Sequence, residues 1–348
     1  MNVDVLVVGA GYAGLCASWR LGLRGLRVLC VEAEPMVATH ASARNAAIWL
    51  PFDDEASTGP LGRASESLLD ALCGRPAWLR PRRALVTASD EAHLEPRLAA
   101  ARACDRAVVR RTREQLHALC PILEEGGAWC GFEVLEAGEL DPAAMCEAVR
   151  RAAVGVGVAI RTGQAVVALQ PHHPEAGVAA QLQHGEWVRA QRAILAAGAW
   201  SARLAERIGL GLPLVPLRRH LAVIDTDSET GGTMVWHLDP ECYFRPEPGG
   251  VLASGCDEEP FEPGLPPVSQ ERLDEMARRL CALSPRLAPA RVRRSWACLR
   301  TFAPDRELVV GPDPRAPAIV WFAGFGGRGM TVAPGAAEEL ARWLHGGP

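Results

Sequence analysis

The chain has 348 residues, which is more than one ordinary core accommodates, so two domains are expected. Its formal net charge of −4 argues against a nucleic-acid-binding protein, because such proteins carry a basic face. Hydrophobic residues make up 49% of the chain, which suits a globular fold, and no uncharged apolar run reaches transmembrane length.

The chain contains no lysine, so arginine supplies every fixed positive side chain and lysine Schiff-base chemistry is excluded. Its 11 cysteines are scattered and form no Cys-x-x-Cys pair, which predicts free thiols in a reducing cytoplasm. The adjacent His172 and His173 precede a proline and predict a loop, and the other histidines lack metal-ligand spacing. We therefore expect a cytoplasmic protein with no metal site.

The first predicted unit is a strand, a glycine turn, a helix and a second strand. Val3–Val8 is an apolar run interrupted only by Asp4, as expected for a central parallel strand. Leu15–Leu23 has helical character and Gly25 ends it, after which Val28–Val31 forms a second buried run. This order is typical of a βαβ unit.

Three glycines, Gly9, Gly11 and Gly14, form the spacing G-x-G-x-x-G in the first turn. The first glycine permits a tight turn, the second lets a pyrophosphate approach the helix N-terminus, and the third lets the helix pack on the strand. Glu32 closes the second strand, where a carboxylate reaches the adenosine ribose hydroxyls and disfavours a 2′-phosphate. The combination predicts dinucleotide binding.

Residues 38–51, ATHASARNAAIWLP, continue with small and polar residues where a simple NAD fold would enter another helix. The backbone here and the side chains of Ser42, Arg44 and Asn45 are suited to line a pyrophosphate and a flavin, which favours FAD. His40 has two interpretations, a group that faces a redox ring and a loop histidine bonded to the backbone.

The C-terminal part repeats the pattern of a strand followed by a glycine turn. Residues 192–201 predict a strand that ends at Gly198, and residues 318–344 predict the strand Ala318–Ala323, a glycine turn and a helix that opens near Thr331. A helix N-terminus carries unsatisfied N–H groups and partial positive charge, which suits the anionic side of a reduced flavin. Two such turns at opposite chain ends favour a split FAD domain.

The middle of the chain predicts a different architecture. Residues 214–223 and 242–255 are predicted strands with proline and glycine turns. Residues 269–283 are predicted to form one amphipathic helix. Its apolar face is predicted to contain Leu273, Met276, Leu280 and Leu283.

The glycine turn with Glu32, together with the stretches THASARNAA, LAAGAWS, SWACLRTFAPD and GFGGRGMT, resembles the D-amino-acid oxidase-like family of FAD-dependent oxidoreductases. The likeness extends along nearly the whole chain and is greatest to D-arginine and other D-amino-acid dehydrogenases, glycine oxidases and sarcosine oxidases. It implies an α/β fold, in which a Rossmann-like FAD-binding domain joins an α+β substrate domain with an antiparallel sheet. The implied FAD domain covers 1–75, 141–213 and 301–348, and the implied substrate domain covers 76–140 and 214–300.

The resemblance also implies roles for single residues. Arg300 stands where members bind the substrate carboxylate with two parallel hydrogen bonds, and Tyr243 matches a tyrosine that assists there. Arg219 matches an arginine that faces the pocket, and His40 matches a histidine near the flavin. The residues expected to bind FAD are Gly9, Gly11, Gly14, Glu32, Ala33, Ser42, Arg44, Asn45, Ala46, Val166, Gly198, Trp200, Gly327, Arg328, Gly329, Met330 and Thr331.

The implied reaction is FAD-dependent oxidation of a small amino acid, such as a D-amino acid or a glycine-like amine. Hydride passes from the α carbon to flavin N5, and the imine hydrolyses to a 2-oxo acid and ammonia. A 2-hydroxy-acid or sarcosine-like oxidoreductase and a non-catalytic flavin-fold binding protein stay open as alternatives. The electron acceptor is oxygen, a quinone or another carrier. The absence of lysine favours a carrier, because sarcosine-oxidase-like members place a lysine over the flavin.

Three further positions have alternative interpretations. Cys298 stands where sarcosine-oxidase relatives link flavin covalently, but we expect a small buried thiol and non-covalent FAD. Arg83, or equally Arg82, stands where arginine-preferring relatives carry an acid, so it either rejects cationic substrates or belongs to a solvated turn. Arg328 either supplies a charge near the flavin or projects to solvent.

Overall fold

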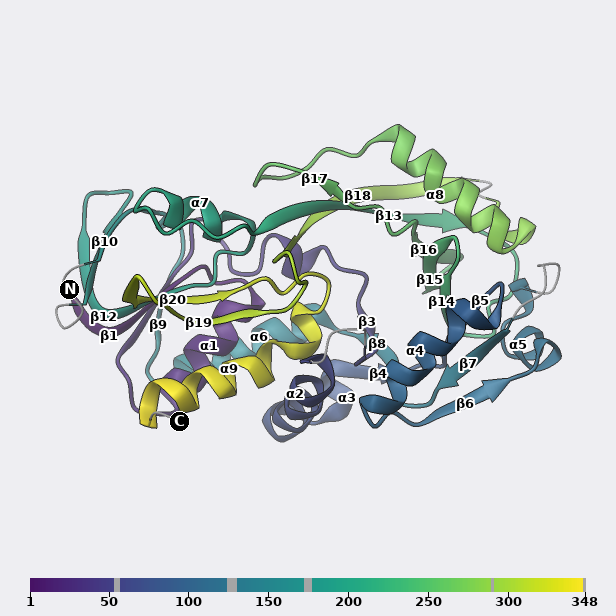
Figure 1. The fold of residues 1–348 in the computed structure, drawn as a ribbon, viewed down its shortest axis with the longest axis horizontal. Coiled ribbons are helices and arrows are strands. Elements are labelled where there is room, and N and C mark those ends of the chain that lie inside the picture. The colour runs from purple at the N-terminus through teal and green to yellow at the C-terminus, as the bar shows by residue number, and fades with distance from the viewer. Residues whose placement is uncertain (53–56, 124–129, 172–176, 289–290, 347–348) are drawn as a thin grey trace.

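The computed structural model describes residues 1–52, 57–123, 130–171, 177–288 and 291–346. Two large sheets lie side by side along the long axis of the molecule (Figure 1). The predicted loop at His172 and His173 lies outside the described residues. Within the described ranges, none of the helices has the length and apolar character needed to cross a membrane.

The first sheet contains both chain ends and has eight strands in the described part of the chain. Its central strands are parallel, and antiparallel strands extend it at the periphery. Its main path runs β10 (Val166–Pro171), β11 (Val178–Leu182), β12 (Trp187–Leu195), β1 (Asn2–Val8), β2 (Val28–Val31) and β9 (Ala159–Arg161), with β20 (Ala316–Ala323) on β12 and β19 (Val309–Asp313) on β20.

The second half of strand β1, Val5–Val8, is entirely apolar because both faces of this sheet are covered. Val5 and Val7 point to the side packed by three helices, whereas Leu6 and Val8 point to the opposite side. The three helices are α1 (Tyr12–Gly22), α6 (Pro142–Gly155) and α9 (Gly329–Gly346), and α7 (Ser201–Glu206) covers the other side. The helix predicted over Leu15–Leu23 starts earlier, because the chain enters it directly from Gly11.

The second sheet has nine strands among the described residues. Its pairs are antiparallel except β14 with β5, which is parallel. The path is β17 (Glu259–Pro260), β13 (Val215–Asp225), β16 (Gly250–Ser254), β15 (Glu241–Glu247), β14 (Met234–Leu238), β5 (Ala84–Ala88), β7 (Cys130–Val134) and β6 (Val108–Arg111), with β18 (Val292–Phe302) also on β13.

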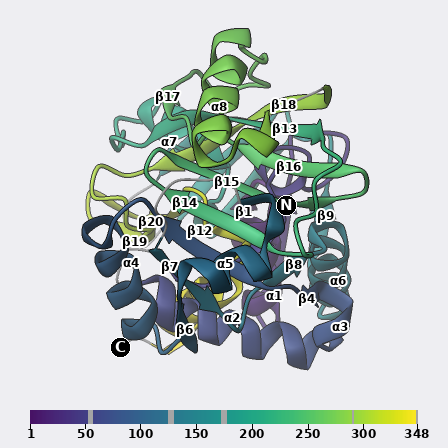
Figure 2. The same ribbon diagram turned by 90° about the vertical axis from the view of Figure 1, so that its right-hand side faces the viewer.

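Helix α8 (Gln270–Leu283) covers the outer face of the second sheet (Figure 2). Its buried residues are Leu273, Met276, Leu280 and Leu283, so the predicted apolar face is confirmed. They pack against Ala222 and Phe244, whereas Leu221 and Tyr243 belong to a cluster on the other face of the sheet. That inner face is therefore left to form a binding site.

Shorter elements complete the chain. A small sheet consists of β3 (Ile48–Trp49), β8 (Gly138–Leu140) and β4 (Leu79–Pro81). The remaining helices are α2 (Thr58–Cys73), α3 (Arg75–Trp78), α4 (Glu91–Ala103) and α5 (Arg113–Leu119). Short 3₁₀ turns are η1 (Ala41–Ala43), η2 (Pro121–Leu123), η3 (Gly198–Trp200) and η4 (Pro285–Leu287).

The expected fold class is confirmed as a mixed α/β fold with one largely parallel and one largely antiparallel large sheet. The eight strands of the first sheet all fall within 1–75, 141–213 and 301–348. The exact domain boundaries stay a prediction. All 11 cysteines lie among the described residues, and none of them forms a disulfide there.

Candidate active site

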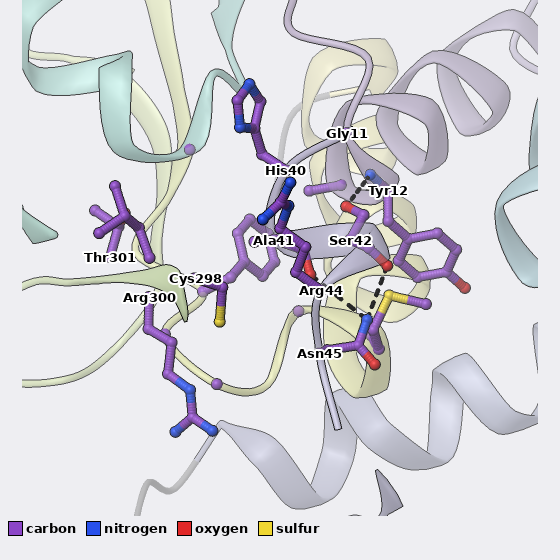
Figure 3. Close-up of a pocket in the computed structure, with 18 of the residues that line it drawn as sticks. Gly11, Tyr12, His40, Ala41, Ser42, Arg44, Asn45, Cys298, Arg300 and Thr301 are labelled. Carbon is purple, nitrogen blue, oxygen red and sulfur yellow. Dashed lines mark hydrogen bonds between the residues drawn. The ribbon is translucent and has the colours of Figure 1, made fainter. Parts of the chain in front are cut away.

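A cavity of about 1150 Å³ lies where the two large sheets meet. It exceeds the roughly 300–1,000 Å³ typical of small-molecule sites, so it has room for a large cofactor beside a substrate. Every residue expected to bind FAD or substrate lines it except Gly14, and Cys298 lines it as well. Figure 3 shows part of this cavity, with segment 40–45 on one side and Arg300 on another.

The three glycines of the first turn have different local surroundings. Gly9 has φ +101°, and a Cβ there would lie 2.7 Å from the carbonyl oxygen of Ala196. A Cβ at Gly14 would lie 1.9 Å from the carbonyl oxygen of Gly9, so helix and strand pack together at this point. Gly11 meets only the Ser42 hydroxyl at 3.5 Å and lines the cavity. Its missing side chain therefore leaves room for a ligand.

Glu32 is held in place at the end of β2. Its carboxylate accepts hydrogen bonds from the backbone N–H of Ala10 at 2.7 Å and of Glu34 at 3.0 Å. The backbone carbonyl of Glu32 accepts from Gln164, close to Val166 where β10 begins. This end of the cavity thus combines a fixed carboxylate with Val166, another residue expected to bind FAD.

His40 lies near this carboxylate end. Its Nε2 is 2.9 Å from Oε1 of Glu34, and its ring centroid is 4.6 Å from that of Trp200. The ring points away from Arg300 in Figure 3. The hydrogen bond is to a carboxylate side chain, not to the backbone. This contact gives no support to His40 as a group acting on substrate, whereas its expected role near the flavin stays a prediction.

Segment 41–47 is held by hydrogen bonds from within and from the second sheet. Asn45 donates to the carbonyl of Ser42 at 2.8 Å and accepts from the N–H of Ala47 at 2.8 Å (Figure 3 shows the first of these). The Arg245 Nε of β15 donates to the carbonyl of Ala46 at 2.7 Å. The Trp296 indole of β18 donates to the carbonyl of Arg44 at 3.0 Å. The segment is therefore preorganised by both halves of the molecule.

The C-terminal glycine turn forms the wall next to Arg300. Gly326 has φ +51°, and a Cβ there would collide with the ring of Phe302. Helix α9 begins at Gly329, and its first residues line the cavity, so its helix N-terminus faces the ligand space. Arg328 Nη1 donates to Oγ1 of Thr58 at 3.0 Å, and Nη2 donates to the carbonyl of Arg306. Arg328 therefore neither projects freely to solvent nor acts as an isolated charge.

Arg300, Cys298 and Arg219 share the cavity face of the second sheet. Cys298 is the register partner of Arg219, and Arg300 lies two residues further along β18. Arg219 is 4% exposed, and its Nη2 donates to Oε1 of Glu258 at 3.2 Å while its Nε is buried without an acceptor among the described residues. Within the same part of the chain, the Arg300 guanidinium makes no hydrogen bond or ion pair with another side chain.

Tyr243 completes this cluster from β15. Burial raises the pKa of its hydroxyl, and the charges of Arg300 and Arg219 oppose that shift. The hydroxyl lies near Ser254 but makes no hydrogen bond of ordinary geometry with any described residue. A buried neutral O–H beside an uncommitted guanidinium is suited to bind a carboxylate.

Sequence reasoning missed several residues of the same wall. Glu241 lines the cavity two residues before Tyr243 on β15, and its Oε1 accepts from the indole of Trp236 at 3.1 Å. Glu258 lines it too, and Arg306 and Arg219 both donate to its carboxylate. The two-residue period of the stretch ECYF could have indicated Glu241 once Tyr243 was singled out. Trp236 could be placed at the cavity only from the strand order of the second sheet.

The interpretation of Arg83 or Arg82 as a pocket charge is wrong. Arg83 Nε donates to Oε1 of Glu133 at 2.9 Å, and Arg82 donates to Glu139. Neither arginine lines the cavity. Arg83 is paired with a glutamate of the second sheet, and Arg82 with a glutamate of the small sheet. Neither arginine therefore presents its charge to a cationic substrate in the cavity.

Comparison with known proteins agrees with this arrangement. A family model described as FAD dependent oxidoreductase, DAO, matches residues 4–343. A glycine oxidase of Bacillus licheniformis is 25% identical over 209 residues, which is 60% of this chain and 55% of that protein. A mitochondrial sarcosine dehydrogenase of Mus musculus is 24% identical over 247 residues, 66% of this chain and 27% of that protein. The chain thus spans about half or less of these relatives.

The fold is shared with solved structures. The crystal structure of glycine oxidase from Geobacillus kaustophilus matches with a TM-score of 0.83 at 22% identity, over 98% of this chain and 94% of that one. The residues present also fit FAD, because Gly11 leaves open space at a helix N-terminus and Glu32 is fixed beside it. With the family model matching nearly the full length, the chain belongs to the DAO family of FAD-dependent oxidoreductases.

Proposed function

We propose that this protein oxidises an amino acid, with a free or N-methylated amine, and passes the electrons to FAD. The observation that carries the proposal is the Arg300 guanidinium, which faces the cavity beside the buried hydroxyl of Tyr243 without a side-chain partner among the described residues. Such a pair would otherwise be costly to desolvate, and a substrate carboxylate satisfies both groups.

The chain contributes binding and orientation to this reaction. When bound, FAD supplies the two-electron acceptor for the hydride of the substrate α carbon. Arg300 and Tyr243 fix the carboxylate, and Arg219 adds a second positive charge behind them. A substrate that enters with a neutral amine needs no protein base. The names of the glycine oxidase and sarcosine dehydrogenase relatives support both a primary and an N-methyl amine.

Arg300→Met tests the carboxylate anchor. Removing one member of a buried charge-assisted pair typically costs about 2–5 kcal/mol, so kcat/KM should fall roughly 30-fold or more while bound FAD is unchanged. Arg293→Met is a matched control on β18, because Arg293 is exposed and pairs with Asp225 outside the cavity. Stopped-flow reduction of the flavin measures both variants. Equal rates in Arg300→Met and wild type would contradict the proposal.

The substrate class is tested by anaerobic bleaching of the bound flavin. D- and L-amino acids, glycine, N-methyl amino acids and 2-hydroxy acids are mixed with the FAD-loaded protein. Release of ammonia with a primary amino acid is the expected result. Bleaching by hydroxy acids alone would replace the proposal with the 2-hydroxy-acid alternative, and no bleaching by any compound would favour a non-catalytic flavin-binding protein.

We also propose that FAD is bound non-covalently and that a carrier such as a quinone reoxidises it. Burial raises the pKa of the Cys298 thiol, although Arg300 and Arg219 oppose this, so the reactive thiolate is disfavoured. The absence of lysine leaves no ammonium to assist reaction with oxygen. Flavin that stays with the acid-precipitated chain would overturn the first point, and rapid reoxidation in air would overturn the second.

A further inference from the structure

We propose that the amino acid oxidised at this site carries an apolar, uncharged side chain, a proposal that rests on the proposed function. One region of the cavity wall, here called the apolar compartment, is lined almost entirely by hydrophobic side chains from β3, β5 and β14 and the segment after β3. Its residues are Ile48, Leu50, Phe52, Ala84, Met234 and Trp236.

The apolar compartment adjoins the carboxylate anchor. Ile48 and Trp236 pack against the cluster that contains Tyr243 and Cys298. The same two side chains also pack against the cluster that contains Phe52 and Met234. A substrate held by its carboxylate at Tyr243 thus has this compartment as neighbouring space, on the side supplied by the second sheet. The adenosine end of the cavity, with Glu32, is formed by the first sheet.

Aromatic rings give the compartment a firm wall. The ring centroids of Phe52 and Trp236 are 6.4 Å apart, with an angle of 45° between the ring planes. The ring centroids of Phe52 and Phe132 are 6.2 Å apart. Met234 is 2% exposed and pairs on β14 with its register partner Ala84 on β5. Aromatic and thioether side chains adapt to alkyl and aromatic groups, which makes them suitable contacts for such substrates.

The charged groups around the compartment already have partners. Glu241 accepts from the indole of Trp236 at 3.1 Å, and the Arg97 guanidinium lies 4.6 Å from the centroid of that same ring. Glu258 accepts from Arg219 and Arg306. A charged substrate side chain would lose its hydration here and would find these groups engaged. An apolar side chain incurs no such penalty.

The first test is a substrate series measured by stopped-flow flavin reduction, with both enantiomers wherever they exist. Leucine, methionine and phenylalanine should show kcat/KM at least about tenfold above glycine, because one methylene in an apolar pocket is worth about tenfold or more. Aspartate and arginine should be slower still. Glycine, sarcosine or a charged amino acid as the best substrate would overturn this inference and leave the proposed function standing. No reduction by any amino acid would instead remove the proposed function.

Variants locate the effect in the compartment. Ala84→Leu adds bulk to the wall and should lower the ratio of kcat/KM for phenylalanine to kcat/KM for glycine about tenfold or more. Ala159→Leu is the control, since Ala159 is exposed on β9. Leu50→Ala removes a lining group and should reduce the preference for leucine over glycine. This variant tests the role of the compartment even if Ala84→Leu fails to fold. A leucine-to-glycine ratio unchanged in Leu50→Ala would overturn the assignment.

Discussion

The position of the Arg300 guanidinium depends on a glycine across the cavity wall. A Cβ at Gly327 would lie 3.0 Å from Nη1 and 3.2 Å from Cζ of Arg300. These separations are shorter than ordinary van der Waals contact, and the guanidinium is the mobile end of a long side chain. An added methyl group should therefore displace the guanidinium and leave the turn itself folded.

Gly327→Ala should accordingly lower kcat/KM by roughly tenfold to a hundredfold, since misplacing a binding group by about 1 Å has effects of that order. Its melting temperature and FAD content should stay close to those of wild type. Gly155→Ala serves as control, because a Cβ there meets nothing within 4 Å. Steady-state kinetics of both variants decide the question, and unaltered kinetics in Gly327→Ala would refute this role.

At the level of elements, Glu338 joins helices α1 and α9. Its carboxylate accepts from Arg20 Nε at 2.7 Å, from Arg24 Nη2 at 2.8 Å and from Arg342 Nε at 3.1 Å. The side chain is only 10% exposed. Burial acts to raise the pKa of Glu338, but the hydrogen bond from Arg20 and the charges of Arg20, Arg24 and Arg342 together outweigh it, so the pKa is lowered. This cluster positions the two helices whose N-termini face the cavity.

Glu338→Gln should lower the free energy of unfolding by about 1–3 kcal/mol at neutral pH, as buried donors lose a charged acceptor. Glu339→Gln, at an exposed neighbouring position, should change it by less than about 0.5 kcal/mol. The ionised Glu338 stabilises the folded state fully above the ordinary glutamate pKa of about 4.3, and this stability is lost as pH falls through the lowered folded-state pKa. Urea unfolding should thus show the gap between wild type and Glu338→Gln narrowing in acid, and a widening gap would contradict the account.

Elements with a local burial pattern could be predicted from the sequence. The buried face of α8 and the apolar run Val5–Val8 of β1 each reflect their own surroundings, because packing acts on every residue of the element. The order of strands in a sheet cannot be predicted from such a local pattern. The parallel pairing of β14 with β5 places Trp236 beside Val86 and opens the apolar compartment, and nothing local in either segment indicates it. Because its partner Glu133 on β7 is likewise not indicated locally, the sequence alone leaves Arg83 with a pocket charge and a solvated turn as alternative interpretations.

More of the candidate site than of the second sheet, which carries half of that site, could be predicted from the sequence. Gly9, Gly11 and Glu32 belong to one continuous motif whose backbone geometry sets the chemistry, and all three line the cavity. Glu258 could not be placed this way, since its partner Arg306 comes from another part of the chain. Carboxylates become functional through tertiary contacts that a linear pattern does not contain.

At the scale of the whole molecule, the cavity draws residues from both chain ends and from both large sheets. A ligand that fills it contacts only the folded arrangement, so FAD should stabilise the entire protein by linkage. At a concentration 100 times its Kd that amounts to about 2.7 kcal/mol. Substitutions at Gly11 and Gly14 of the first turn separate this ligand effect from the stability of the fold itself, because of these two only Gly14 is enclosed by backbone.

Gly11→Ala should leave the melting temperature of the FAD-free protein unchanged, since a Cβ there meets only the Ser42 hydroxyl at 3.5 Å. It should nevertheless abolish most of the rise in melting temperature on adding FAD, because the methyl group occupies the space next to the helix N-terminus. Gly14→Ala, by contrast, should destabilise the FAD-free protein. Its free energy of unfolding should fall by about 1–3 kcal/mol, since the added Cβ would lie 1.9 Å from the carbonyl oxygen of Gly9. Differential scanning calorimetry with and without FAD measures both effects. A full FAD-dependent rise in Gly11→Ala would place the pyrophosphate elsewhere and would undermine the assignment of this turn as the cofactor cradle.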